Sequence, residues 1–223
     1  MRTNNTQKRC EDVFHAYLLR NVQYAGENDF PVIRSSQDIP RKMIPFSKAL
    51  REKKDYHQWI CFYENDQQFE RIWNNPTKYL HILKKFDGVI TPDFSVYCNM
   101  PYSMQIWNIF RSRALGAWLQ KQGIKVIPNI RFGDTRTFEC CCDGISKNSV
   151  IAIGSLGCIK SKVYRDTFEA GVNYVVKRLR PRTLIIYGCP PKNVNEIKKQ
   201  GVNVVIIKPL SFYDQEGKVW EEE

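Results

Sequence analysis

The chain has 223 residues, of which 43% are hydrophobic and 13% aromatic, and this composition excludes a disordered or fibrous protein. The length suits one globular domain, or at most two small ones, with a buried core. A formal net charge of +11 at pH 7 favours nucleic acid or a phosphorylated ligand as partner, although a generic basic surface that keeps the protein soluble would carry the same charge.

The first 55 residues are less regular than the rest of the chain. Apolar residues at helical spacing predict a helix over residues 11–21, and residues 30–33 are typical of a short strand. A charged helix is expected over residues 46–54.

From residue 59 onward, buried strands alternate with amphipathic helices. Apolar runs predict strands over residues 59–63, 88–90, 125–130, 150–153, 183–187 and 202–207. Helical spacing predicts helices around residues 69–73, ended by Pro76, and over residues 79–85, 103–122, 163–179 and 193–200. In the helix over residues 103–122, six residues form an apolar stripe that we expect to face the core: Met104, Trp107, Phe110, Ala114, Leu115 and Trp118.

This alternation predicts an α/β fold. Strands that are apolar throughout are typical of a mainly parallel sheet with helices on both faces. A doubly wound sheet and a TIM-barrel-like arrangement both satisfy the pattern. Because no linker or repeat divides the sequence, we expect a single α/β domain over residues 1–223, with residues 1–55 as its less regular part and residues 137–148 as an inserted loop or hairpin.

No export signal or membrane anchor is visible in the sequence. The start is polar, and the most apolar stretch, residues 150–159, is too short to cross a bilayer. We therefore expect a soluble cytoplasmic protein, whose eight cysteines are reduced. There is no Cys-x-x-Cys pair and the histidines are not spaced as ligands, so no metal site is predicted. The sequence does not indicate a cofactor.

Two carboxylates follow neighbouring predicted strands. Asp93 comes after the strand over residues 88–90, and Asp134 comes after the strand over residues 125–130. In parallel α/β folds such positions meet at the carboxyl edge of the sheet, so we expect both side chains in one cleft. The pair would be catalytic, as nucleophile and general acid or base. Alternatively, each aspartate caps a helix or braces a turn.

Basic and glycine-rich segments at the same edge predict a phosphate-binding site. Gly154 and Gly157 allow backbone N–H groups to approach an anion, and Arg131 and Lys160 add positive charge. The alternative is a tight turn between strand and helix. Arg111 and Arg113 lie beside the apolar stripe of their helix, where they would assist in binding phosphate or pair with a neighbouring acid.

Several ordered segments resemble a known family. They read FDGVITPDFS (86–95), RSRALG (111–116), VIPNIRFGD (126–134), CDGISKNS (142–149) and GCIK (157–160). Together they resemble the domain-of-unknown-function family numbered 4417 of bacteriophages and mobile elements, over roughly residues 24 to 210. The resemblance implies a phage or mobile-element setting, and therefore the cytoplasm of a host bacterial cell, but no particular activity.

Two hypotheses remain open from the sequence. The first is an enzyme that acts on nucleic acid or a nucleotide through the strand-end carboxylates. The second is a non-catalytic protein, either a DNA-binding accessory factor or an inhibitor of a host defence system, whose partner is nucleic acid or a host protein. Residues 160–199, which hold ten Lys or Arg against three Asp or Glu, fit either.

Overall fold

Two parallel sheets carry the main strands in a computed structural model of the protein, which describes residues 14–158 and 161–209. The first sheet has the order β3-β4-β5-β6 and the second the order β7-β8-β9, and every pairing within them is parallel. Their strands are β3 (Met43–Pro45), β4 (Trp59–Cys61), β5 (Gly88–Ile90), β6 (Val126–Ile127), β7 (Val150–Gly154), β8 (Thr183–Tyr187) and β9 (Asn203–Ile207). A small antiparallel pair, β1 (Tyr24–Ala25) with β2 (Phe30–Pro31), precedes them.

The two sheets are joined at one seam. Just beyond β6, Asn129 forms an isolated parallel bridge with Ala152 of β7. The backbone N–H of Ile130 donates to the carbonyl of Ala152 at 2.8 Å, and the N–H of Ala152 donates to the carbonyl of Pro128 at 3.0 Å. The seam therefore places the residues that follow β6 directly beside the end of β7.

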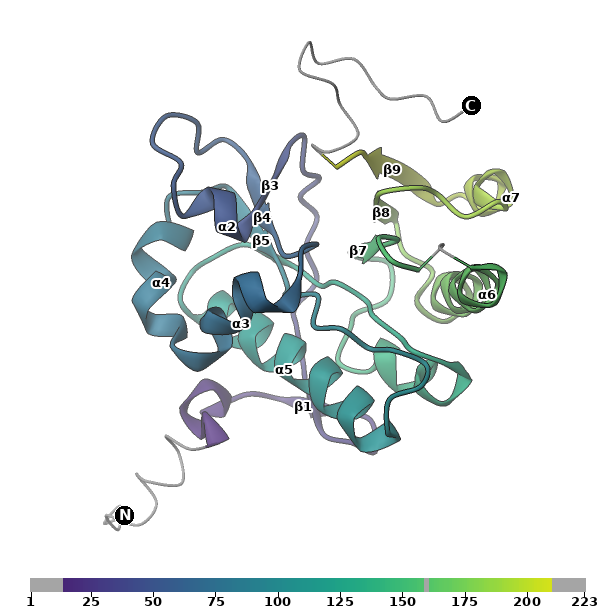
Figure 1. The fold of residues 1–223 in the computed structure, drawn as a ribbon, viewed down its shortest axis with the longest axis horizontal. Helices are drawn as coiled ribbons and strands as arrows, with labels where there is room; N and C mark the ends of the chain where they lie inside the picture. The colour runs from purple at the N-terminus through teal and green to yellow at the C-terminus, as the bar shows by residue number, and fades with distance from the viewer. Residues whose placement is uncertain (1–13, 159–160, 210–223) are drawn as a thin grey trace.

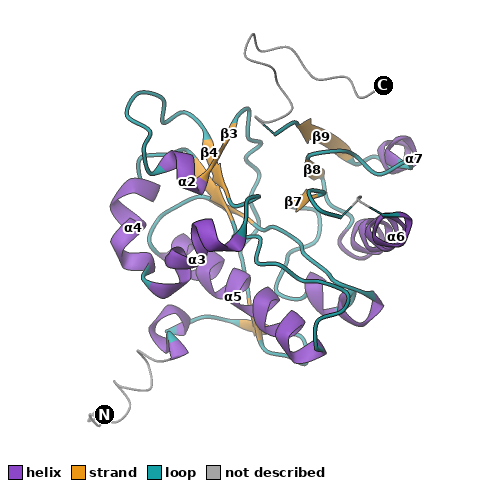
Figure 2. Cartoon of the chain, in the orientation of Figure 1, coloured by secondary structure: helices purple, strands orange, loops and turns teal. Residues whose placement is uncertain are grey.

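Helices cover the outer faces of the sheets. In Figures 1 and 2, α2 to α5 lie beside β3–β5, while α6 and α7 lie beside β7–β9. Among the described residues, no helix has the length and apolar character needed to cross a bilayer. The helices are α2 (Phe46–Ala49), α3 (Asp66–Asn74), α4 (Pro76–Leu83), α5 (Tyr102–Lys121), α6 (Lys162–Leu179) and α7 (Val194–Lys199), with 3-10 helices η1 (Ala16–Leu19), η2 (Thr135–Thr137) and η3 (Cys140–Cys142).

The main hydrophobic core is accompanied by a smaller cluster of buried side chains that come mostly from the strands. This cluster contains side chains from every strand from β3 to β8, with Val205 and Ile207 of β9 packed against it. The α/β fold with mainly parallel strands is therefore confirmed. Within the described residues, no strand pairing links β3 to β9, so the arrangement is barrel-like on its inside but is not closed.

Some local predictions were wrong. The strand β3 was not predicted, because its three residues include a methionine and a proline and give little β signal. Of the helix expected over residues 11–21, residues 11–13 lie outside the described residues, Phe14 is α-helical, and Ala16–Leu19 form the 3-10 helix η1 instead of continuing an α-helix. The helix α5 is present, but Met104 and Trp107 are 50% and 43% exposed, whereas Gln105 and Asn108 are buried. The start of α5 faces polar loops that follow the strands, so its buried face there is polar.

Gly171 brings α6 against the end of the first sheet. A methyl group at this position would lie 2.1 Å from the ring of Phe132, which follows β6 and lines the cleft described below. The absence of a side chain at residue 171 therefore sets how closely the helix approaches the strand ends.

We predict that Gly171→Ala destabilises the protein by about 1–3 kcal/mol through overpacking, although alanine is the better helix former. Chemical denaturation of the single variants and of Gly171→Ala with Phe132→Ala checks this. The double variant should lose less stability than the sum of the singles, because the clash requires both side chains. Additive losses would contradict the packing described here.

Candidate functional site

A cleft of about 770 Å³ opens where the parallel strands end. Its walls are the segments that follow β4, β5, β6 and β7, together with the first turns of α6. Parallel strands present their carboxyl ends at one edge, so residues far apart in the sequence meet there. Each of these segments contributes at least one residue, including Tyr63, Asp93, Arg131, Leu156 and Tyr164.

Asn129 connects these strand ends through hydrogen bonds. Its side-chain amide donates to Oδ1 of Asp93 at 2.6 Å, and its side-chain oxygen accepts from the hydroxyl of Tyr63 at 3.0 Å. Its backbone N–H donates to the hydroxyl of Thr91 at 2.8 Å, and its carbonyl accepts from Arg113 at 2.9 Å. Asn129 is only 1% exposed, and a buried polar residue with its groups bonded is held in one orientation.

Asp93 forms a buried ion pair with Arg131. Its Oδ2 lies 3.6 Å from a terminal guanidinium nitrogen, and the two side chains are 11% and 15% exposed. Burial raises the pKa of Asp93 above its ordinary value of 3.8, while Arg131 and the hydrogen bond from Asn129 act in the opposite sense. A carboxyl group with a raised pKa is suited to exchanging protons with a ligand.

Arg131 is also held by the end of β7. Its terminal nitrogen also donates to the carbonyl of Gly154 at 3.2 Å. Burial is the largest single influence and lowers the pKa of Arg131, but Asp93, Cys158, Tyr63 and Tyr97 together outweigh it and the net shift is upward. The guanidinium is therefore charged. Its Nε is buried and has no hydrogen-bond partner among the described residues, so the described structure does not use all of its donors.

The other carboxylates that line the cleft are occupied by structural contacts. Glu64 accepts hydrogen bonds from the backbone N–H and the hydroxyl of Ser47, and Asp66 accepts the same pair from Ser95. These acids brace the loops that follow β4 and β5. Asp93 differs from these two acids, because its partners among the described residues are the side chains of Asn129 and Arg131, which themselves belong to the site.

The structure does not bring Asp134 into the cleft beside Asp93. Asp134 is the N-cap of η2 and accepts from the backbone N–H of Arg136 at 2.9 Å. Its carboxylate also binds the guanidinium of Arg136 and the amide of Gln105. Hydrogen bonds from Arg136 hold the pKa of Asp134 well below its ordinary value. The side chain of Asp134 therefore caps η2 and stabilises the turn at its start.

Arg111 and Arg113 also lie outside the lining of the cleft. Arg111 pairs with Glu70. Arg113 is 1% exposed and donates to the carbonyl oxygens of Asn129 and Cys141, at 2.9 and 2.6 Å. Both arginines therefore hold the segments that surround the strand ends, and Arg113 supports the site through Asn129.

The glycine-rich segment does reach the cleft. Gly154 ends β7, and a methyl group there would lie 2.5 Å from the ring of Tyr63, so this close approach requires glycine. Gly157 lines the cleft with a φ of +77°. Lys160 lies outside the described residues. Among the residues that are described, no three His, Cys, Asp or Glu side chains are grouped as metal ligands.

Sequence reasoning missed Asn129 and Tyr63. Asn129 was included in an apolar strand, and its polar side chain inside that strand was the available signal. Tyr63 was predicted as the end of a buried strand, and it does stack on Tyr187 with ring centroids 4.6 Å apart. Nothing in the sequence indicated that its hydroxyl would reach across to Asn129.

Comparisons with known proteins agree with the resemblance noted from the sequence. The family model described as "Domain of unknown function (DUF4417)" matches residues 22–206. The chain is 37% identical over 203 residues to "Gene 1 protein" of Mycobacterium phage L5, covering 87% of each chain. It is also 37% identical over 144 residues to "Gene 1 protein" of Mycobacterium phage D29, covering 63% of this chain and 53% of that one. No solved structure matches. The association with phages is confirmed.

We predict that Asp93 and Asp134 titrate on opposite sides of 3.8, Asp93 above it and Asp134 below it. Carbon-13 NMR of the side-chain carboxyls measures both. Asn129→Ala should raise the pKa of Asp93 further, because it removes a hydrogen bond to the charged form. As a matched control, Arg136→Gln should raise the pKa of Asp134 and leave Asp93 unchanged. An Asp93 that titrates below 3.8 would contradict the described burial.

Proposed function

This chain belongs to the DUF4417 family, and from that premise and the geometry of the cleft we propose that it acts on nucleic acid or a nucleotide, with one nucleotide unit held at the strand ends. The observation that carries the proposal is the buried Asp93–Arg131 pair on the wall of the cleft. It supplies an anion-binding group and a proton-exchanging group side by side. The volume of about 770 Å³ lies in the range of small-molecule sites.

Arg131 is suited to the phosphate of such a ligand. It is charged, it is anchored to Gly154, and it retains donors that the protein does not use. A guanidinium presents several N–H groups in a planar fork that matches phosphate geometry. The glycine at 157, whose φ is positive, leaves backbone exposed in the same part of the lining.

Two tyrosines are suited to the base. Tyr97 and Tyr164 line the cleft and are 54% and 45% exposed. Exposed aromatic rings stack on nucleobases, which is worth roughly 1–3 kcal/mol per base. An inorganic phosphate or a simple sugar phosphate would make no use of these rings, so their presence favours a nucleotide among phosphorylated ligands.

Asp93 is the residue that we assign to chemistry. Asn129 and Arg131 hold its two oxygens, and its pKa is raised by burial. In this role it takes a proton from, or gives one to, a group of the bound nucleotide. Asn129 is a positioning residue, because it acts through Asp93 and Tyr63.

We predict that the protein binds at least one of the four common nucleoside 5′-monophosphates, and that Arg131→Lys weakens this binding about tenfold. Lysine keeps the charge opposite Asp93 but loses the planar fork. Isothermal titration calorimetry measures the affinities. Arg136→Lys is the control, since Arg136 is exposed and pairs with Asp134 outside the lining. Equal losses in the two variants, or no binding by the wild type, would contradict the proposal.

We also predict that Asp93→Asn abolishes turnover while nucleotide affinity changes less than threefold. The asparagine keeps the shape and removes the proton-exchanging group. Mass spectrometry of mononucleotides and of a short single-stranded oligonucleotide after incubation detects products, and thermal melting verifies the fold. Product formation by Asp93→Asn at the wild-type rate would refute the chemical role while leaving the binding role standing.

A further inference from the structure

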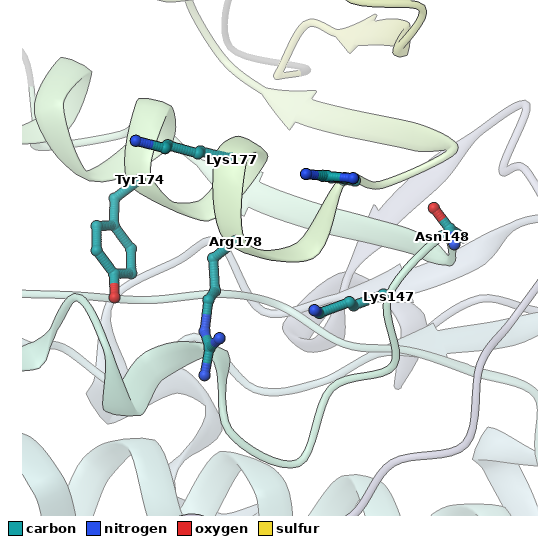
Figure 3. Close-up of a pocket in the computed structure, with 6 residues that line it drawn as sticks. Lys147, Asn148, Tyr174, Lys177 and Arg178 are labelled. Carbon is teal, nitrogen blue, oxygen red and sulfur yellow. The ribbon is translucent and has the colours of Figure 1, made fainter.

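A basic groove lies at the opposite ends of the strands from the cleft. It consists of two adjoining hollows of about 490 and 540 Å³ that share Asn148, Lys177 and Arg180. Its residues come from the loop before β7, the last turns of α6 and the segments before β8 and β9. In Figure 3, Lys147 from the loop and Arg178 from α6 extend into the same space. Five cations line this groove: Lys147, Lys177, Arg178, Arg180 and Arg182.

These cations are not neutralised by neighbouring acids. All five residues are exposed. Within residues 14–158 and 161–209, none of them forms an ion pair with a carboxylate. Asp143 is near enough for Arg178 to lower its pKa, although burial raises that pKa overall. Within the described chain, no ion pair therefore offsets the positive charge of the groove.

Helix electrostatics explain only part of this cluster. Lys177 and Arg178 lie in the last turn of α6, where cations stabilise the negative end of the helix dipole. The loop cations Lys147 and Arg182 are not on the helix. Arg180 is the C-cap with a φ of 45° and a ψ of 58°, the left-handed region where glycine is normally preferred. An arginine is more strained in this conformation than a glycine would be, so the backbone does not account for a cation at this position.

We propose that the basic groove binds the phosphate backbone of nucleic acid. This inference concerns a second surface and goes beyond the nucleotide site of the cleft. A row of exposed Lys and Arg side chains neutralises successive phosphates and releases their counterions. Tyr174 is the one aromatic residue in the described lining and is half-buried, so the groove offers mainly charge. Contacts of this kind position a duplex without reading its sequence.

The groove fits nucleic acid better than other polyanions. Binding to a lipid surface is commonly strengthened by apolar side chains that enter the bilayer beside the cations. The exposed large hydrophobic residues of the described chain include none from the groove. A protein partner would normally bury an aromatic or aliphatic anchor, and the groove has no such pocket in its described lining. A backbone of regularly spaced phosphates requires only the cations.

Fluorescence anisotropy with a labelled 20-base-pair DNA duplex of random sequence tests the proposal. The wild type should bind with a slope of log K against log salt of about −4 to −5, as expected for five phosphate contacts. The triple variant Lys147→Ala, Lys177→Ala, Arg178→Ala should bind at least about tenfold more weakly, with a slope smaller by about 3. The control Lys53→Ala, Lys54→Ala, Lys84→Ala removes the same charge from exposed lysines outside the groove and should retain most of the affinity.

Arg180→Gly separates binding from folding. Glycine relieves the left-handed strain, so this variant should melt at or above the wild-type temperature while it loses DNA affinity. Equal losses in the two triple variants would show only a generic charge effect and would overturn the proposal. So would binding to anionic vesicles but not to DNA. Mononucleotide affinity measured in the cleft should be unchanged in the groove variants, so either site can fail without the other.

Discussion

The hydrogen-bond network of Asn129 is the interaction on which the candidate site depends. Its backbone bridges the two sheets, and its side chain joins Tyr63 to Asp93. The buried guanidinium of Arg113 donates to the backbone carbonyl of Asn129. A buried network of this kind is stabilising only when its members are all satisfied, because an unpaired polar group in a low-dielectric interior is costly. The geometry of the strand ends is therefore fixed as a unit.

The same parallel topology gives the molecule two different ends. Loops at the carboxyl ends of the strands enclose the cleft, whose charged groups are buried and paired. At the opposite end, the groove beside β7 and β8 carries five exposed cations that form no ion pair with a carboxylate in the described chain. The first environment suits selective binding of one small group, and the second suits weak, salt-sensitive attraction of a polyanion. The five cations of the groove thus lie away from the site proposed for chemistry.

The strands and helices were largely predictable because continuous apolar runs and helical spacing are strong local signals. The position of Asp93 followed from the rule for parallel strand ends. The same rule led us to expect Asp134 in the cleft. In the structure, Asp134 is instead the N-cap of η2, where its carboxylate accepts hydrogen bonds from Arg136. The partners of Asn129 were not predictable, since they depend on how two sheets meet. That junction is set by long-range packing rather than by any local pattern.

The central claim is that the strand-end cleft, and not the basic groove, receives a nucleotide. The most direct measurement is NMR of the Asp93 carboxyl and the Arg131 guanidinium while a nucleoside 5′-monophosphate is added. The account predicts that both resonances shift along one binding curve, with the affinity found by calorimetry, while resonances of Lys147 and Arg178 stay in place. Shifts confined to the groove residues would contradict it.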